Sequence, residues 1–170
     1  ITVRDSSLSA CTQAVVAAEV GQLDLAYDYF AEAALVDLHD LENNTRDGIH
    51  VASHAGTWIA AVAGFGGMRE IGGELRFAPR LPTRLARLRF RLLFRGRLIE
   101  VETTPTQATY RLLEGDPLTI RHHGAALTVA VDHPVTRNNP QHVRMPKLEQ
   151  PLGRAPAHRG ANPLSITVPA

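Results

Sequence analysis

The spacing of the apolar residues in this chain changes once, close to Gly73. Before that point they recur every three or four residues, the period of an α-helix, and after it they alternate with polar residues as in a β-strand. The pattern predicts helices over residues 1–72 and strands over residues 73–132. Residues 133–170 are rich in Pro, Arg and His, which predicts an extended tail.

Three helices are expected in the first region. The first runs from about Leu8 to Val20, the second from Leu23 to about Asp37, and the third from near Gly48 to about Ala63. The third is small and apolar on nearly all sides, as helices are when a larger helical assembly buries them. Three helices of this kind do not complete a core. We therefore expect them to belong to a larger α domain whose earlier part is outside this sequence.

The second region predicts a small antiparallel sheet or sandwich, because short alternating segments recur with glycine or proline between them. Phe77, Phe90 and Phe94 are expected core positions. The expected strands are Glu74–Phe77, Ala86–Leu93, Arg97–Val101, Ala108–Leu113, Leu118–His122 and Ala126–Val131.

Composition excludes several classes of protein. The chain is 44% hydrophobic and 21% charged, so it can bury a core. Its net charge of +1 argues against a dedicated nucleic-acid binder. Cys11 is the single cysteine, which rules out an internal disulfide framework and a cysteine-rich zinc site. No apolar run is long enough to span a bilayer, and no signal peptide is evident. The first residue is Ile, so a fragment of a longer protein is expected.

The segment Arg4–Ser9 (RDSSLS) is a candidate anion site at the start of the first helix. It supplies the hydroxyl groups of Ser6 and Ser7. The backbone N–H groups of a helix start are unpaired and lie at the positive end of the helix dipole. The same residues are also typical of an ordinary N-cap, and that alternative stays open.

A second candidate anion site, Asn44–His50, precedes the third helix. Gly48 allows close approach to the backbone, and His50 can direct a ring N–H at an anion. The alternative is a buried, hydrogen-bonded histidine beside a structural glycine. His54 lies four residues after His50 on the same helix face, but a metal site is not expected because no third ligand is obvious.

Other polar groups are expected to be structural. The acidic residues near the end of the second helix should cap helices and solvate a loop, and the basic stretch in the sheet region should form a solvated sheet face. His122–His123 should be a surface pair, and Gly64–Gly67 a hinge between helix and strand. The acidic residues are Asp37, Asp40, Glu42 and Asp47, and the basic ones Arg80, Arg84, Arg87, Arg89, Arg91, Arg95 and Arg97.

Taken together, the segments resemble the C-terminal part of glycoside hydrolase family 65, which includes the maltose, trehalose and kojibiose phosphorylases. Order and spacing agree from about Ile1 to Gly124. The matching segments are RDSSLS (4–9), AAEVGQLDLAYDYF (17–30), NNTRDGIHVASHAGTW (43–58), GFGGMRE (64–70), LRFAPRLP (75–82), LRFRLLFRGRLIEVE (88–102) and LTIRHHG (118–124).

The resemblance implies an α+β fold in which terminal helices of an (α/α)6 barrel precede a small antiparallel C-terminal β-sheet domain. Residues 1–72 would supply the barrel helices and residues 73–132 the sheet domain. Residues 133–170, the Pro- and Arg-rich tail, lie outside the resemblance.

The resemblance also implies inverting phosphorolysis of an α-linked glucose disaccharide to β-glucose 1-phosphate. Ser6, Ser7, Gly48 and His50 would bind the phosphate. The general-acid glutamate is expected upstream, so none of Glu19, Glu32 or Glu42 should serve and the fragment alone should be inactive. No metal or organic cofactor is expected, since inorganic phosphate is the co-substrate.

The expected partners are the disaccharide, inorganic phosphate and the rest of the parent catalytic domain. Neither a nucleic acid nor a membrane is expected, the location should be cytoplasmic, and the family allows a homodimer. Two alternatives stay open. One is a hydrolase of the same family, such as a trehalase, which uses water, and the other is a non-catalytic accessory β module.

Overall fold

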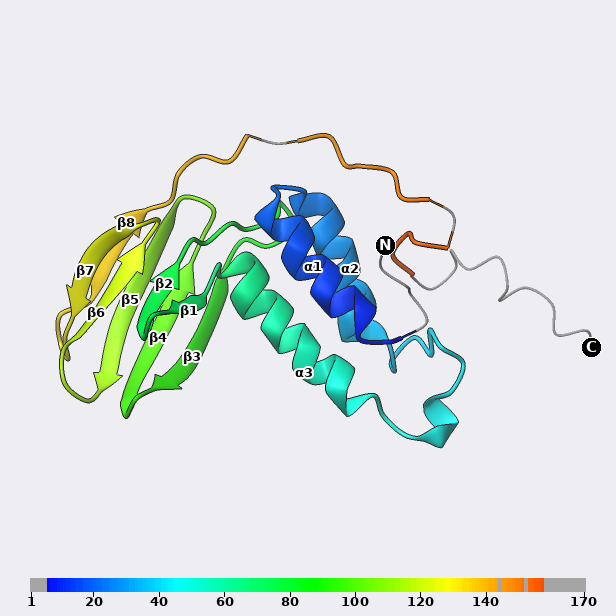
Figure 1. Cartoon of the computed structure of the whole chain (residues 1–170), viewed down its shortest axis with the longest axis horizontal. Coiled ribbons are helices and arrows are strands. Elements are labelled where there is room, and N and C mark those ends of the chain that lie inside the picture. The colour runs from blue at the N-terminus through cyan, green and yellow to red at the C-terminus, as the bar shows by residue number, and fades with distance from the viewer. Residues whose placement is uncertain (1–5, 144, 152, 158–170) are drawn as a thin grey trace, which may run out of the picture.

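The computed structural model describes residues 6–143, 145–151 and 153–157. A helical layer and a β-sandwich lie beside each other, and an extended segment leaves the sandwich and runs back over the helices (Figure 1). Among these residues, no helix is both long enough and apolar enough to cross a membrane.

The helical layer is built from α1 (Ser9–Glu19), α2 (Leu23–Leu35) and α3 (Val51–Ile59). A 3₁₀ turn, Thr45–Asp47, precedes α3, and a π-helical turn, Ala60–Phe65, continues it. Between α1 and α2 the chain reverses at Gly21 (φ 82°), where the Gln22 N–H bonds the Ala17 carbonyl and the Gly21 N–H bonds the Ala18 carbonyl. This is a Schellman ending, which requires the left-handed conformation that glycine adopts without strain.

Small residues let the helices approach one another closely. Ala14, Ala18 and Ala26 are buried in the helical core. A Cβ added at Gly56 of α3 would lie 2.3 Å from the Cys11 sulfur of α1, so the contact between these helices requires glycine. The other side of α3 is uncovered: the side chains of Val51, Trp58 and Ile59 are at least half exposed, as is typical of a helix that packs against further structure.

Two four-stranded sheets form the sandwich. One has the order β1-β2-β6-β7, made of Arg69–Ile71, Glu74–Phe77, Leu118–His122 and Ala125–Val129. The other has the order β3-β4-β5-β8, made of Leu88–Phe94, Arg97–Thr103, Gln107–Glu114 and Val135–Asn138. All neighbours are antiparallel except β2 and β6, which are parallel. The expectation of a purely antiparallel sheet is therefore wrong for this pair.

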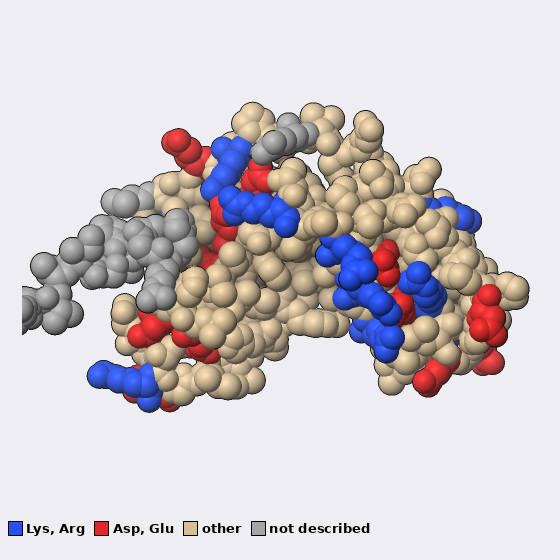
Figure 2. Space-filling model, turned by 180° about the vertical axis from the view of Figure 1, so that it is seen from behind, with Lys and Arg blue, Asp and Glu red and all other residues tan. Residues whose placement is uncertain are grey.

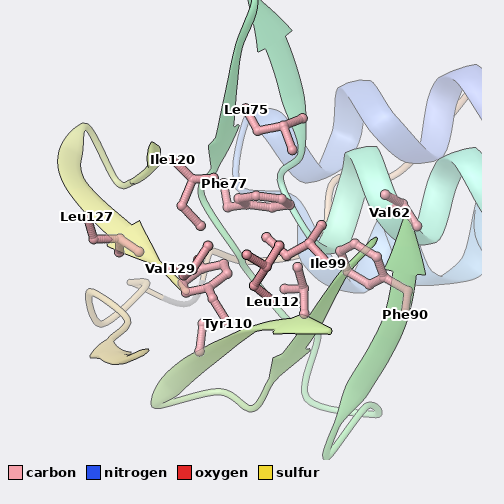
Figure 3. Packing of buried hydrophobic residues seen from close by; sticks show 12 residues of the cluster. Val62, Leu75, Phe77, Phe90, Ile99, Tyr110, Leu112, Ile120, Leu127 and Val129 are labelled. Atoms are coloured by element: carbon pink, nitrogen blue, oxygen red, sulfur yellow. The ribbon is translucent and has the colours of Figure 1, made fainter. Parts of the chain in front are cut away.

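The main core lies between the two sheets, where alternate residues of each strand point inward (Figure 3). Phe77 and Phe90 are buried as expected, and Phe94 packs against the core from its edge. The π-helical turn adds Val62, which joins the helical layer to the sandwich. The buried residues of this core are Val62, Leu75, Phe77, Phe90, Ile99, Val101, Ala108, Tyr110, Leu112, Ile120, Leu127 and Val129.

The expectation that residues 133–170 form only an extended tail is wrong for its first part. Val135–Asn138 is strand β8, which pairs with β5 in the register Thr109↔Thr136. An edge strand gains its order from ladder hydrogen bonds, so it needs little apolar patterning of its own. The positions Arg4 and Asp5 and the last residues, 158–170, lie outside the described part of the chain.

Candidate functional site

Three helix ends meet at the side of the helical layer that faces away from the sandwich: the starts of α1 and α3 and the end of α2 (Figure 1). Ser53 in the first turn of α3 joins them. Its buried hydroxyl lies 3.2 Å from the Ser7 carbonyl oxygen and 3.5 Å from the Ala33 carbonyl oxygen. We call this region the helix-end corner; its candidate side chains are those of Ser6, Ser7, Asp37, His50 and His54, with Gly48 between them.

Asp37, just after α2, organises the corner by binding two histidines. Its Oδ1 lies 2.5 Å from Nδ1 of His50, and its Oδ2 accepts the backbone N–H of His50 at 2.9 Å. The same Oδ2 lies 2.8 Å from Nε2 of His54. The hydrogen bond from the His50 ring, together with the bonds from the His50 backbone and from His54, lowers the pKa of Asp37 to about 2. The carboxylate is therefore ionised at neutral pH.

The geometry leaves one nitrogen of the His50 ring available. Because Nδ1 faces a carboxylate, it carries the proton of that hydrogen bond. Nε2 of His50 makes no hydrogen bond to any side chain or backbone group of residues 6–143, 145–151 and 153–157. In the imidazolium form this nitrogen is a charged donor, which suits an anionic ligand.

The serines before α1 satisfy part of the turn and keep donor capacity. The Ser6 hydroxyl oxygen accepts the Leu8 N–H at 3.3 Å, so the capping alternative is realised in part. Ser7 is half-buried, and its carbonyl oxygen is the group that Ser53 binds. A hydroxyl that accepts one hydrogen bond can still donate its own proton to an oxyanion.

Gly48 opens the corner on the α3 side. Its backbone has φ 127° and ψ 174°, a region that only glycine occupies without strain. Gly48 is exposed, and a Cβ added there would meet nothing within 4 Å. The glycine is therefore needed for the path of the backbone, and the surface around it is open.

The structure brings together the two segments that carry the predicted site residues. The serine loop and the first turn of α3 are bonded through Ser7 and Ser53, and Gly48 immediately precedes the segment of His50. Among the described residues, no direct hydrogen bond joins Ser6 or Gly48 to the His50 ring.

Sequence reasoning missed Asp37, which was expected only to cap a helix and solvate a loop. The signal that points to it is the pair His50 and His54, one helical turn apart on one face, because two such rings can share one acceptor. A carboxylate 13 residues earlier in the chain supplies it. Within the described residues, no group of three His, Cys, Asp or Glu side chains is arranged to hold a metal ion.

Two further polar clusters lie in the sandwich. His122 is buried, so the expected surface pair is wrong: its Nδ1 lies 2.8 Å from the Tyr110 hydroxyl and its Nε2 3.0 Å from the Asn138 carbonyl oxygen. The basic stretch is also more than a solvated face. Arg89 and Arg91 bind the buried Glu100 carboxylate, and basic and acidic groups lie intermixed over the sandwich (Figure 2).

Comparison with known proteins gives the chain's relationships. Residues 1–59 match the model of the glycosyl hydrolase family 65 central catalytic domain, and residues 68–129 match the model of the family 65 C-terminal domain. An uncharacterised glycosyl hydrolase of Mycobacterium tuberculosis is 52% identical over 162 residues, which are 94% of this chain and 21% of that protein. The α,α-trehalose phosphorylase of Thermoanaerobacter brockii is 48% identical over 120 residues, which are 71% of this chain and 16% of that protein.

A solved structure supports the same relationship. A protein described as a kojibiose phosphorylase from human microbiome superposes with a TM-score of 0.76 at 26% identity, over 82% of this chain and 20% of that chain. The chain thus spans about a fifth of the length of the relatives that it matches. It belongs to glycosyl hydrolase family 65, of which it contains the end of the central catalytic domain and the C-terminal domain.

Proposed function

We propose that this chain is the C-terminal portion of an inverting α-glucoside phosphorylase and that its helix-end corner binds the attacking phosphate. The observation that carries the proposal is the His50 ring, which Asp37 holds by Nδ1 at the start of a helix while Nε2 stays unbonded within the described residues. Phosphorylases among the family relatives support the same assignment.

In this reaction a glutamic acid, expected in the part of the parent that precedes this chain, donates a proton to the glycosidic oxygen. An oxygen of inorganic phosphate attacks the anomeric carbon from the opposite face, where an inverting hydrolase holds its water. The bond between the anomeric carbon and the glycosidic oxygen breaks. The products are β-glucose 1-phosphate and the released sugar, and atoms and charge balance without a metal or an organic cofactor.

The corner would supply donors to the phosphate oxygens. In its imidazolium form His50 would donate from Nε2, and Ser6 and Ser7 would donate hydroxyl protons. The backbone path at Gly48 leaves room for the anion to approach. Asp37 is a positioning residue, because it fixes the ring of His50 rather than touching the phosphate.

A hydrolase of the same family is the second candidate. One observation favours it: the Ser6 hydroxyl oxygen is already engaged by the Leu8 N–H, as expected for a structural turn. In that case Ser6, Ser7 and His50 would organise the helix ends, and water would take the place of phosphate.

The test uses the full-length parent protein with trehalose, maltose and kojibiose, each with and without inorganic phosphate. We expect β-glucose 1-phosphate to form only with phosphate. The variant His50→Ala should lower kcat/KM for phosphate by about 100-fold, the effect of losing one oxyanion donor. The control His133→Ala, on the exposed side of the sandwich, should match the unaltered enzyme. Glucose release that does not depend on phosphate would establish the hydrolase instead.

A further inference from the structure

The described residues that follow β8, 139–143, 145–151 and 153–157, form an extended arm that returns over the helical layer (Figure 1). We call it the C-terminal arm. It lies outside both stretches that the family models match. Its described residues carry no helix or strand, so its backbone groups must find partners elsewhere.

Helix α2 provides those partners from one face. The Leu148 N–H donates to Oε1 of Gln22 at 3.1 Å, and the Ala157 N–H donates to Oε2 of Glu32 at 2.8 Å. Between them, the Tyr29 hydroxyl donates to the Arg154 carbonyl oxygen at 2.9 Å. Residues 22, 29 and 32 are seven and three positions apart, which places them on a single side of the helix.

These three side chains are buried although each is polar: Gln22, Tyr29 and Glu32 are all less than a tenth exposed. A buried polar group is costly unless it is hydrogen-bonded. The helix therefore carries a row of buried polar groups, and each of the three has a hydrogen bond to a backbone atom of the arm. Recognition through the backbone selects an extended conformation more than a particular sequence.

One side-chain contact adds a charge to this recognition. Lys147, the single lysine of the chain, forms an ion pair with Asp28 of α2. Asp28 also binds Arg84, from the linker between β2 and β3, at 2.9 Å. The arm and the sandwich linker thus meet at one carboxylate of α2.

The arm does not fill the whole surface of α2 on which it lies. Leu148 of the arm remains 57% exposed. Two hollows, of about 240 Å³ and about 130 Å³, adjoin Leu148, and Leu25 of α2 lines both. The polar row supplies hydrogen bonds that hold the arm on α2, and such contacts exchange with water.

The first residues of the arm are anchored separately, on the sandwich. The Asn139 N–H donates to the Thr106 carbonyl oxygen at 2.8 Å, and the Asn139 side-chain amide donates to the Thr104 carbonyl oxygen at 2.8 Å. His142 Nε2 lies 3.4 Å from the Pro79 carbonyl oxygen. Separate parts of the arm make the contacts with the sandwich and the contacts with α2, so release from α2 would not require β8 to leave its sheet.

We propose that the face of α2 formed by Gln22, Tyr29 and Glu32 is a recognition site for an extended chain segment, and that residues 145–151 and 153–157 occupy it in cis as a detachable strap. The strap joins the last strand of the sandwich to the helical layer. The ligand that the site fits is an extended peptide with a cationic side chain at its start, opposite Asp28, and backbone groups presented to the three polar side chains.

The test uses the full-length parent truncated after Val143 and a fluorescent peptide with the sequence of residues 144–158. We expect the peptide to bind the truncated protein and to bind the intact protein at least about tenfold more weakly, because the tethered arm competes at a millimolar effective concentration. In the truncated protein, Tyr29→Phe should weaken binding about fivefold, since it removes only the hydroxyl that holds the arm. Tyr27→Phe is the matched control on the same helix, because its ring contacts Phe30 and Arg84 instead.

Binding does not depend on phosphorolysis, so its outcome is separate from that of the proposed function. Equal binding to intact and truncated protein, or a folded truncated protein that does not bind, would overturn the proposal. So would a dimer of the intact protein that disappears on truncation, since the arm would then seat on a second copy.

If the truncated protein does not fold, hydrogen exchange in the intact protein decides. Tyr29→Phe should speed exchange in the peptide 145–157 at least about threefold, whereas Tyr27→Phe should not change it. Equal exchange in the two variants would overturn the proposal.

Discussion

Two carboxylates in different parts of the molecule share one electrostatic property. Asp37 in the helix-end corner and Glu100 on β4 both have a pKa lowered to about 2, in each case chiefly by a hydrogen bond from a basic side chain. Glu100 is 2% exposed and binds Arg89 at 2.7 Å, Arg91 at 2.8 Å and Arg111 at 3.3 Å. Asp37 binds His50 and His54.

The two clusters differ in whether the basic partners of the carboxylate keep a nitrogen for another ligand. At Glu100, arginines from the neighbouring strands β3 and β5 close over both oxygens, in a cross-strand ladder that stabilises the sheet. At Asp37, each imidazole uses one ring nitrogen and keeps the other. A lowered pKa is therefore common to a structural cluster and a candidate site, and it is the ring nitrogen left without a partner among the described residues that marks the site.

The largest effect that separates the two clusters is expected from Asp37→Asn in the full-length parent. The variant keeps the shape of the side chain but removes the charge that fixes the His50 ring. We expect kcat/KM for phosphate to fall about 100-fold, equivalent to about 2.7 kcal/mol. Because Asp37 is ionised down to about pH 2, its own titration should not shape the pH profile between pH 5 and 8.

The control for Asp37→Asn is Asp116→Asn, at a 90% exposed carboxylate near Arg97. It should leave phosphate use unchanged. An Asp37→Asn enzyme with normal phosphate kinetics would show that the corner is as purely structural as the ladder.

The opposite pattern is expected from Glu100→Gln. Loss of this charge leaves three arginines without their shared partner, and we expect the free energy of unfolding to fall by about 2 kcal/mol while phosphate kinetics stay unchanged. Urea unfolding of the parent measures it, with the exposed Glu114→Gln as a neutral control. A stability loss no greater than that of Glu114→Gln would mean that the ladder contributes little.

The sequence predicted local elements well where glycine or proline marks their ends. The strands Glu74–Phe77 and Leu118–His122 have the bounds that were expected, since glycine or proline stands near their ends. The first helix was expected over 8–20 and covers Ser9–Glu19. These elements are determined by periodicity and by turn residues, which act over a few positions.

Features that depend on distant partners were not predicted. Strand β8 is ordered by its ladder to β5, which lies 27 residues away in the pair Thr109 and Thr136. The role of Asp37 depends on histidines that follow a loop. The expected phosphate ligands could be named from the resemblance, but the group that orients His50 becomes visible only when the ends of α2 and α3 are placed side by side.

A smaller effect tests whether the corner needs its open backbone. In Gly48→Ala the new methyl group meets nothing within 4 Å, so the cost is that of the backbone conformation alone, about 1 kcal/mol of unfolding free energy. The KM for phosphate should rise about threefold as the loop relaxes. Gly72→Ala is the matched control, because it also has a positive φ and open surroundings but lies in the β1–β2 turn. Equal phosphate kinetics in the two variants would remove Gly48 from the site.

The smallest effect concerns a third cluster, in which burial rather than hydrogen bonding shifts the pKa. Desolvation, with the neighbouring His122, His142 and Arg80, lowers the pKa of His123 to about 4. The unfolded chain binds a proton at this residue below about pH 6.5, while the folded chain stays neutral until about pH 4. Stability should therefore fall as the pH drops through this window, with a slope of less than one proton.

His123→Asn should flatten that slope, and it preserves the backbone because asparagine tolerates the φ of 46° found there. Urea unfolding at pH 7, 6 and 5 measures it, with the exposed His133→Asn as control. Asp37 and Glu100, whose lowered pKa values also add to the slope as the unfolded chain takes up protons, contribute equally in His123→Asn and in the control, so the difference in slope between the two variants reports on His123. A slope that persists in His123→Asn would assign the acid sensitivity to His122, whose pKa burial also lowers. Both ring nitrogens of His122 have partners within the sandwich, in contrast to His50, which is held by one.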